Sequence, residues 1–210
     1  MIKLYSASVG PYMTDCYIIT DEESGESAAV DCALFDGDYE YLLRSSGVSS
    51  LKYILLTHGH FDHISGVKKL KETCGGTICI HPDDADCLTD PSKSLNQFTN
   101  YAVQEPVTAD ILVGEGSVLM LGNTEIKVMH TPGHTRGSVC YLVGDIMFSG
   151  DTLFRCSMGR TDFPGGSTKQ LFASLARIGQ MDGDLAIYPG HGEKTILAFE
   201  KEYNRYLRAK

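Results

Sequence analysis

Four side chains that can bind a metal ion lie within one seven-residue segment of the sequence. The segment Thr57-His-Gly-His-Phe-Asp-His63 contains His58, His60, Asp62 and His63. An imidazole binds a metal through a lone pair on one ring nitrogen, and a carboxylate adds hard oxygen donors. Because these side chains alternate in direction, one tetrahedral ion cannot accept all of them. The segment therefore indicates two metal ions held side by side, and it favours metal-dependent hydrolysis.

Three further potential ligands occur later in the chain in a similar local setting. His134, Asp151 and His191 each directly follow a glycine at the end of a strand-like run. Glycine beside a ligand lets the backbone turn tightly and approach a metal closely. Together with the first segment they make five histidines and two aspartates. This set suits a two-metal site in which one carboxylate is shared.

The elements that flank the first segment are predicted to be rigid. Residues 51–56 form a largely apolar run, which predicts a strand buried on both faces. After His63, apolar residues recur at helical spacing as far as Cys74, and Gly75 closes the segment. The metal-binding segment thus joins a strand end to the start of a helix. Such a loop is a common place for a site, because the scaffold on both sides is fixed.

Strands interspersed with helices are predicted in both halves of the remaining chain. Strands are expected at 16–20, 27–31, 77–81, 138–143, 145–148 and 185–188, and helices at 39–46, from the N-cap Ser167 onward, and at 196–207. Residues 82–110 are irregular and are interpreted as a lid-like excursion beside the site, anchored by Leu95, Phe98 and Tyr101. The pattern predicts one layered α/β domain over residues 1–210.

Composition and charge exclude several classes of partner. The formal net charge of -9 argues against nucleic acid and anionic membranes. The seven cysteines lie apart, which favours reduced thiols in a reducing compartment. No run approaches the ~18 apolar residues that a membrane span needs, and the N-terminus has no apolar core of secretory length. We therefore expect a cytoplasmic protein that acts on a small-molecule substrate.

The order of the motifs resembles the metallo-β-lactamase fold superfamily and, within it, the short glyoxalase II-like hydrolases. The resemblance runs through Thr57–His63, His134, Asp151 and His191 and so covers nearly the whole chain. It implies an α/β (α+β) fold: a four-layer αββα sandwich of two mixed sheets, with helices on the outer faces and metals at one edge. It also implies a ligand assignment: His58, His60 and His134 on the first ion, Asp62, His63 and His191 on the second, and Asp151 bridging.

The resemblance further implies a binuclear metal hydrolase, and the leading hypothesis is a thioesterase of the glyoxalase II type. Its substrate would be a hydroxyacylglutathione or a related small thioester. A hydroxide bridging the metals would be the nucleophile, because metal binding lowers the pKa of water to about 7. Asp62, which can also carry a proton, and Asp151 are the predicted catalytic residues. Zinc is the expected metal, although iron and manganese suit the same ligands.

Two other activities remain open for a chain with these motifs. A persulfide dioxygenase-like oxidoreductase would use most of the same ligands to hold a single iron. A lactonase would open a cyclic ester with the same hydroxide. Few residues follow His191, so the basic C-terminal extension that longer glyoxalase II enzymes use for glutathione is not expected here.

Supporting roles are predicted for residues that lie near the motifs. Asp31 ends a strand close to the expected site and is predicted to hydrogen-bond a ligand histidine. Arg155 and Arg160, in the loop after Asp151, are predicted to bind a substrate carboxylate. An ion pair of Arg160 with Asp162 is the alternative. The sequence leaves three roles undecided: those of His81, His130 and Cys156.

Overall fold

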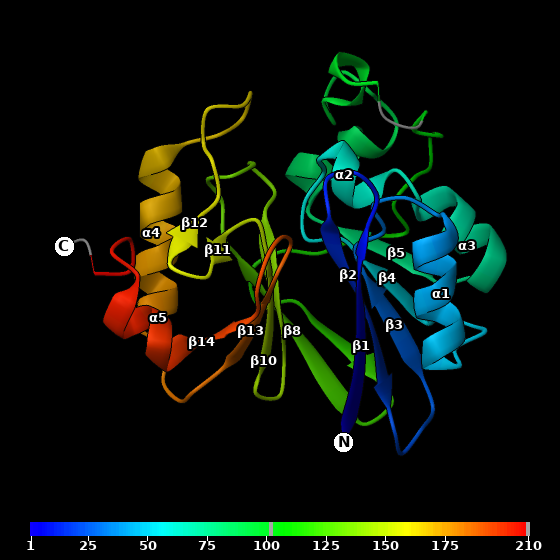
Figure 1. Cartoon of the computed structure of the whole chain (residues 1–210), viewed down its shortest axis with the longest axis horizontal. Coiled ribbons are helices and arrows are strands. Elements are labelled where there is room, and N and C mark those ends of the chain that lie inside the picture. Colours follow the sequence, from blue (N-terminus) through cyan, green and yellow to red (C-terminus); the bar gives the residue numbers. More distant parts are fainter. Residues whose placement is uncertain (101–102, 209–210) are drawn as a thin grey trace.

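The computed structural model describes residues 1–100 and 103–208, and the predicted anchor Tyr101 lies outside them. Within these ranges, two six-stranded sheets pack face to face, and helices cover both outer faces (Figure 1). Helices α1 (Gly37–Ser46) and α3 (Val67–Cys74) cover one sheet, while α4 (Thr168–Gly179) and α5 (Leu197–Tyr203) cover the other. The prediction of an αββα sandwich of two mixed sheets is confirmed.

The first sheet comes from the N-terminal half of the chain. Its strand order is β1 (Ile2–Val9), β2 (Thr14–Asp21), β3 (Ser27–Val30), β4 (Tyr53–Leu55), β5 (Thr77–Ile80) and β6 (Ile111–Leu112). Strands β1 to β3 are antiparallel, whereas β3 to β6 are parallel. The end of β4 leads directly into the metal-binding segment and the short helix α2 (Phe61–Ile64).

The second sheet comes from the C-terminal half. Its order is β14 (Thr195–Ile196), β13 (Ala186–Pro189), β10 (Ile146–Gly150), β9 (Val139–Val143), β8 (Thr124–His130) and β7 (Val118–Leu121). A small ribbon of β11 (Leu153–Phe154) and β12 (Ser157–Met158) follows β10. Only β10 and β13 are parallel neighbours in this sheet, as far as the described residues show. Their carboxyl ends therefore lie at the same edge.

The described residues form three apolar clusters, one at each interface between layers. Strand β4 shows the principle, because Ile54 joins the cluster under α1 and α3 whereas Leu55 joins the cluster between the sheets. The predicted burial of this run on both faces is therefore correct. The hydroxyl of Tyr141 in β9 donates to the Leu56 carbonyl at 3.0 Å, and Val139 N donates to the Thr57 carbonyl at 2.8 Å. These bonds fix the second sheet to the start of the metal-binding segment.

The predicted helix boundaries hold where a capping signal is present. Asp36 accepts from the amides of Asp38 and Tyr39 at the start of α1, and Gly47 ends the helix at φ 72°. The Ser167 side chain accepts from Gln170 N and begins α4. No described helix is long and apolar enough to cross a bilayer.

Two predicted helices are shorter than the apolar pattern indicated. The helix after His63 divides into α2 and α3, because Gly66 N donates to the Cys32 carbonyl rather than continuing the helical ladder. The C-terminal helix ends at Tyr203. There the side-chain amide of Asn204 turns inward and donates to the Ser157 carbonyl at 3.0 Å.

Candidate metal centre

The seven predicted ligands converge at one edge of the sandwich. Donor atoms of three groups lie within 4.8 Å of one another: His58, His60 and His134; Asp62, His63 and His191; and His58, His63 and Asp151. The Asp151 carboxylate lies between the first two groups, with Oδ2 3.5 Å from His134 Nε2 and 3.7 Å from His191 Nε2. The fold thus brings the seven predicted side chains together, with a carboxylate within reach of both groups.

Sheet topology brings the later ligands together. Asp151 follows β10 and His191 follows β13, so the parallel pairing of these strands places both side chains at the same edge. Gly190 is required between them. A Cβ atom at this position would lie 2.3 Å from Asp151 Oδ1 and 2.6 Å from His63 Cε1. Any larger residue would displace the carboxylate or the ring.

Backbone carbonyls orient two of the histidines. His134 Nδ1 donates to the Arg160 carbonyl at 2.8 Å, and His191 Nδ1 donates to the Tyr12 carbonyl at 3.1 Å. Because Nδ1 carries the proton in each ring, the Nε2 lone pair of each faces the centre. The Arg160 and Tyr12 backbones therefore select the tautomer that can bind a metal.

Asp31 orients two further histidines, one directly and one through Thr57. His63 Nδ1 donates to Asp31 Oδ2 at 2.8 Å, and the Thr57 hydroxyl donates to the same oxygen at 2.8 Å. With its only proton used, the Thr57 oxygen accepts from His58 Nδ1 at 3.1 Å. Asp31 sits at φ 58°, a left-handed conformation that aspartate tolerates better than most residues. Its contacts match the supporting role predicted for it.

Two buried polar atoms in the centre lack a hydrogen-bond partner among the described residues. They are His58 Nε2 and Asp151 Oδ1. Nearby, His60 Nδ1 lies 2.9 Å from His134 Nε2, so two more ring nitrogens face the same space. Unsatisfied buried groups carry a free-energy cost of about 1–3 kcal/mol each, which cations bound between them would remove. Five imidazoles and two carboxylates form a donor set that suits zinc, iron or manganese. The residues present therefore fit divalent metal ions.

The charge states of three side chains in the cluster also suit cation binding. Burial, together with the neighbouring His134, lowers the pKa of His60 to about 3, which keeps its ring neutral. Burial opposes ionisation of Asp151, but His63 and His134 outweigh it and lower the pKa of this carboxyl. Burial likewise opposes ionisation of Asp62, but His63 and the close contact with His191 outweigh it and lower the pKa of this carboxyl. Both carboxylates are therefore ionised at neutral pH.

A buried aspartate that sequence analysis did not single out joins the two halves of the centre. Asp84 Oδ2 accepts from Gly59 N at 2.9 Å and from the Thr135 hydroxyl at 2.7 Å, while Oδ1 accepts from Gly137 N at 2.9 Å. Gly59 separates His58 from His60, and Thr135 follows His134. Asp84 thus fixes the first ligand segment to the His134 loop. It lies in the irregular stretch 82–110, where no periodicity marks it as buried.

A cavity of about 700 Å³ opens over the centre. Leu95 in the 82–110 excursion is buried and lines the cavity, which agrees with the prediction that it anchors this excursion. Phe98 also lines the cavity but is 72% exposed, so the prediction that it anchors the excursion is wrong. The ring instead lies at the cavity mouth.

The two arginines predicted to bind substrate have different surroundings. Arg160 lines the cavity, but its guanidinium pairs with Asp162 through two contacts of 2.7 Å. Arg155 is not brought to the cavity. It pairs with Glu193 and lies over the Phe199 ring, beside a separate surface pocket. The loop turns Arg155 away because Cys156 N donates to the buried Glu200 carboxylate.

The three residues whose roles the sequence left undecided lie outside the cluster of seven predicted ligands. The rings of His81 and His130 stack on each other at 4.0 Å, and His130 Nε2 donates to the Arg136 carbonyl. Cys156 is exposed at φ 55°. The stacked rings and the bond to the Arg136 carbonyl support the turn that precedes His134.

Known proteins resemble the chain over nearly its whole length. A family model described as the metallo-beta-lactamase superfamily matches residues 9–191. An uncharacterized protein of Mycobacterium leprae is 35% identical over 208 residues, covering 94% of this chain and 95% of the relative. The hydroxyacylglutathione hydrolase GloC of Haemophilus influenzae is 29% identical over 208 residues, covering 96% of each chain.

Solved structures show the same arrangement of the backbone. The B3 metallo-beta-lactamase BLEG-1 superposes with a TM-score of 0.88 at 32% identity, covering 100% of both chains. TTHA1623, solved in a di-iron-bound form, gives a TM-score of 0.85 at 31% identity and covers 96% of this chain and 99% of its own. The chain therefore belongs to the metallo-beta-lactamase superfamily, whose members are generally hydrolytic metalloenzymes.

Proposed function

We propose that the chain is a binuclear metal-dependent hydrolase that cleaves a thioester of the glyoxalase II type. The main support is the convergence of seven histidine and aspartate side chains beneath one cavity, where His58 Nε2 and Asp151 Oδ1 are buried without partners among the described residues. The similarity to GloC along both chains supports a thioester as the substrate class.

The chain's own residues divide into two groups that would each hold one ion. The first group is His58, His60 and His134, the second is Asp62, His63 and His191, and Asp151 would serve both. Bound divalent ions supply Lewis acidity toward a carbonyl oxygen and lower the pKa of water toward neutrality. Zinc is the proposed metal, although the donor set also accepts iron or manganese.

Asp62 is proposed to accept and pass on a proton during hydrolysis. Its Oδ2 atom lies 3.3 Å from His191 Nε2, and the side chain lines the cavity. As an ionised carboxylate it can take a proton at this oxygen. A thiol leaving group has a pKa of about 8.5, so it departs as a thiolate without a dedicated general acid. This makes a thioester a better fit than an amide.

Metal analysis coupled to substrate assays tests the proposal. Metal-free protein is reloaded with zinc, iron or manganese, and bound metal is measured together with hydrolysis of S-lactoylglutathione and of a neutral thioester. We expect close to two ions per chain and metal-dependent thioester hydrolysis, with Asp62→Asn retaining metal better than it retains activity. A single bound iron, oxygen uptake with a persulfide and no thioester hydrolysis would contradict the proposal.

A further inference from the structure

The cavity over the metal centre has a wall that differs sharply from its base. The base carries the metal-binding side chains, whereas the remaining lining is dominated by large apolar side chains. We call the following set the apolar wall: Phe61, Leu95, Phe98, Phe154, Met158 and Phe163. These residues come from α2, from the 82–110 excursion and from the segment after Asp151 that contains β11 and β12. Three separate segments thus supply the same chemistry to one cavity.

The cavity lining offers almost no positive charge to a substrate. Apart from the metal-binding histidines at its base, Arg160 is the one basic side chain among the described residues that line it. Its Nε and Nη2 atoms donate to the two Asp162 oxygens at 2.7 Å each, and its guanidinium lies 3.8 Å from the Phe163 ring centroid. A guanidinium that is already paired bidentately and stacked extends the apolar wall rather than receiving a carboxylate.

Apolar side chains also reach the mouth of the cavity. Phe98 is 72% exposed and Tyr12 is 47% exposed, and both line the cavity. The Tyr12 ring meets Phe61 edge to face at 5.1 Å, which connects the mouth to the interior. A contiguous apolar surface that runs from the mouth into a cavity is typical of a ligand-binding groove.

We propose that the thioester substrate carries an uncharged apolar group, about the size of an aromatic ring, that binds against the apolar wall. Carboxylates such as those of glutathione add little to binding. The proposal rests on the thioesterase function above and names the substrate class for that site. About 700 Å³ of cavity accommodates an aryl group together with a thioester at the metal-binding base.

Four thioesters that cross two acyl groups with two thiols test the proposal on metal-loaded protein. The acyl groups are lactoyl and 3-phenyllactoyl, and the thiols are glutathione and neutral N-acetylcysteamine. We expect the phenyl group to raise kcat/KM by about tenfold or more, because an apolar pocket rewards buried carbon. Replacing N-acetylcysteamine by glutathione should change kcat/KM by less than about threefold. A preference for glutathione that exceeds the phenyl effect would overturn the proposal.

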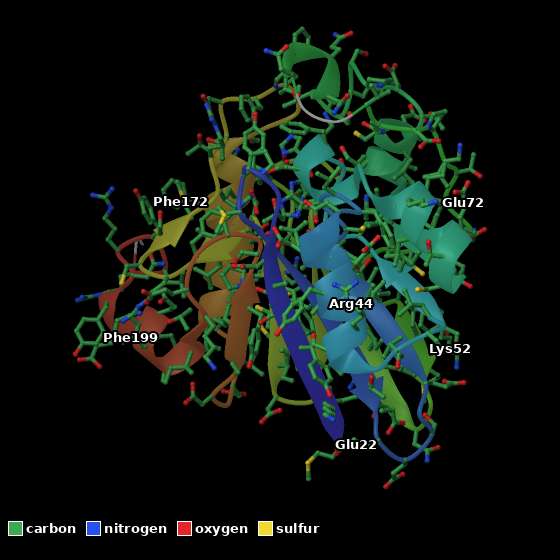
Figure 2. The ribbon with its side chains drawn as sticks, turned by 45° about the vertical axis from the view of Figure 1, so that its right-hand side comes forward. Glu22, Arg44, Lys52, Glu72, Phe172 and Phe199 are labelled. Atoms are coloured by element: carbon green, nitrogen blue, oxygen red, sulfur yellow. The ribbon has the colours of Figure 1, made fainter. Side chains whose placement is uncertain are left out.

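Single substitutions test whether the apolar wall causes the preference for the phenyl group. Phe98→Ala should reduce the kcat/KM ratio of the 3-phenyllactoyl to the lactoyl thioester by about threefold to tenfold. Because Phe98 is exposed, this substitution should leave the stability of the fold unchanged. Phe199→Ala is the matched control, since Figure 2 shows Phe199 on the outer helix α5 at the lower left, and it does not line the cavity. Asp162→Ala frees Arg160 and should shift preference toward the glutathione thioesters. An unchanged phenyl advantage in Phe98→Ala would also overturn the proposal.

Binding measurements separate this proposal from the thioesterase function. Thioethers cannot be hydrolysed, so calorimetry with S-benzyl-N-acetylcysteamine and S-methylglutathione reports recognition alone. Tighter binding of the benzyl compound supports the apolar wall even if no thioester is hydrolysed, an outcome that would reject only the thioesterase function. Tighter binding of S-methylglutathione, with thioester hydrolysis intact, would reject only the apolar substrate class.

Discussion

The two sheets contribute to the metal centre in opposite ways. The first half supplies His58, His60, Asp62 and His63 from one continuous segment after β4. The second half supplies its three side chains from three loops that lie far apart in the sequence: His134, Asp151 and His191. In the first half local sequence determines the geometry, whereas in the second half the strand pairing does. The ligands of one candidate metal centre can therefore be adjacent in the sequence of one half of a chain and dispersed in the other.

The two ligand groups also differ in their exposure to solvent. All members of the first group are buried: His58, His60 and His134. In the second group the side chains of His191 and Asp62 are 28% and 15% exposed, and His191 relies on the Tyr12 carbonyl. The second group should therefore exchange its ion more readily.

The largest effect is expected where the halves share a side chain. Asp151→Ala removes the carboxylate that reaches both groups, so it should lower kcat/KM by about a thousandfold or more and abolish binding of one ion. Bound metal and thioester hydrolysis are measured on the same preparation. Retention of two ions and of most activity would show that Asp151 is not shared.

Removing one ligand from each half tests the difference in exposure. His58→Ala and His191→Ala should each weaken one ion by more than about 100-fold, since even supporting contacts are worth about 10–100-fold. The ion left in His191→Ala, within the buried first group, should resist a chelator. The ion left in His58→Ala should be removed quickly. Competition with a coloured chelator measures both rates, and equal rates would contradict the comparison.

A smaller effect is expected at the residue that joins the halves. Asp84→Ala leaves the buried Gly59 and Gly137 amides unsatisfied and removes the bond from Thr135, which should lower the free energy of unfolding by about 3 kcal/mol. It should weaken the first ion by about 10–100-fold and spare the second. Urea unfolding and metal titration check the two effects. Asp83→Ala, at the exposed neighbouring position, is the control.

The smallest effect is expected at the opposite end of the sandwich, where the hairpin between β2 and β3 meets the turn between β7 and β8 (Figure 1). Asp21 accepts from Asn123 N and Glu23 N, and these bonds lower the pKa of its carboxyl. Its stabilising contribution is therefore present above the unfolded pKa, near about 4, and is lost as the pH falls through the lower folded value. Asp21→Asn should show a shallower loss of stability below pH about 4, with unchanged metal content. Urea midpoints measured across pH check this.

The features of the structure that depend on local sequence patterns could be predicted. The layered fold and the convergence of Thr57–His63 with the three later loops follow from apolar runs, glycine-flanked strand ends and motif order. The supporting role of Asp31 could be predicted because this residue ends a strand beside the site. Its bond to the ligand His63 is the one predicted from that position, whereas its bond to Thr57 was not predicted.

The remainder depends on contacts that no local pattern records. Asp84 sits in an irregular stretch, and its partners lie as far away as Gly137. Glu200 holds the loop that carries Arg155, and Glu193 pairs with its side chain, so spacing alone did not distinguish it from Arg160. Helix α5 stops early because Asn204 finds partners in another loop. In each case a tertiary contact overrides or supplements the local preference.

The N-terminal hairpin has a consequence for the order in which the site assembles. Asp15 N donates to the Gly190 carbonyl at 2.8 Å, and the Tyr17 hydroxyl donates to the Pro189 carbonyl across 172 positions of sequence. Contacts of such separation close the largest loops, so they are expected late in folding. His191 is therefore expected to reach its position only after β2 has paired with the segment at Pro189 and Gly190. If the proposed second ion binds there, its uptake should require the completed fold, and the rate of uptake should follow the slowest step of refolding.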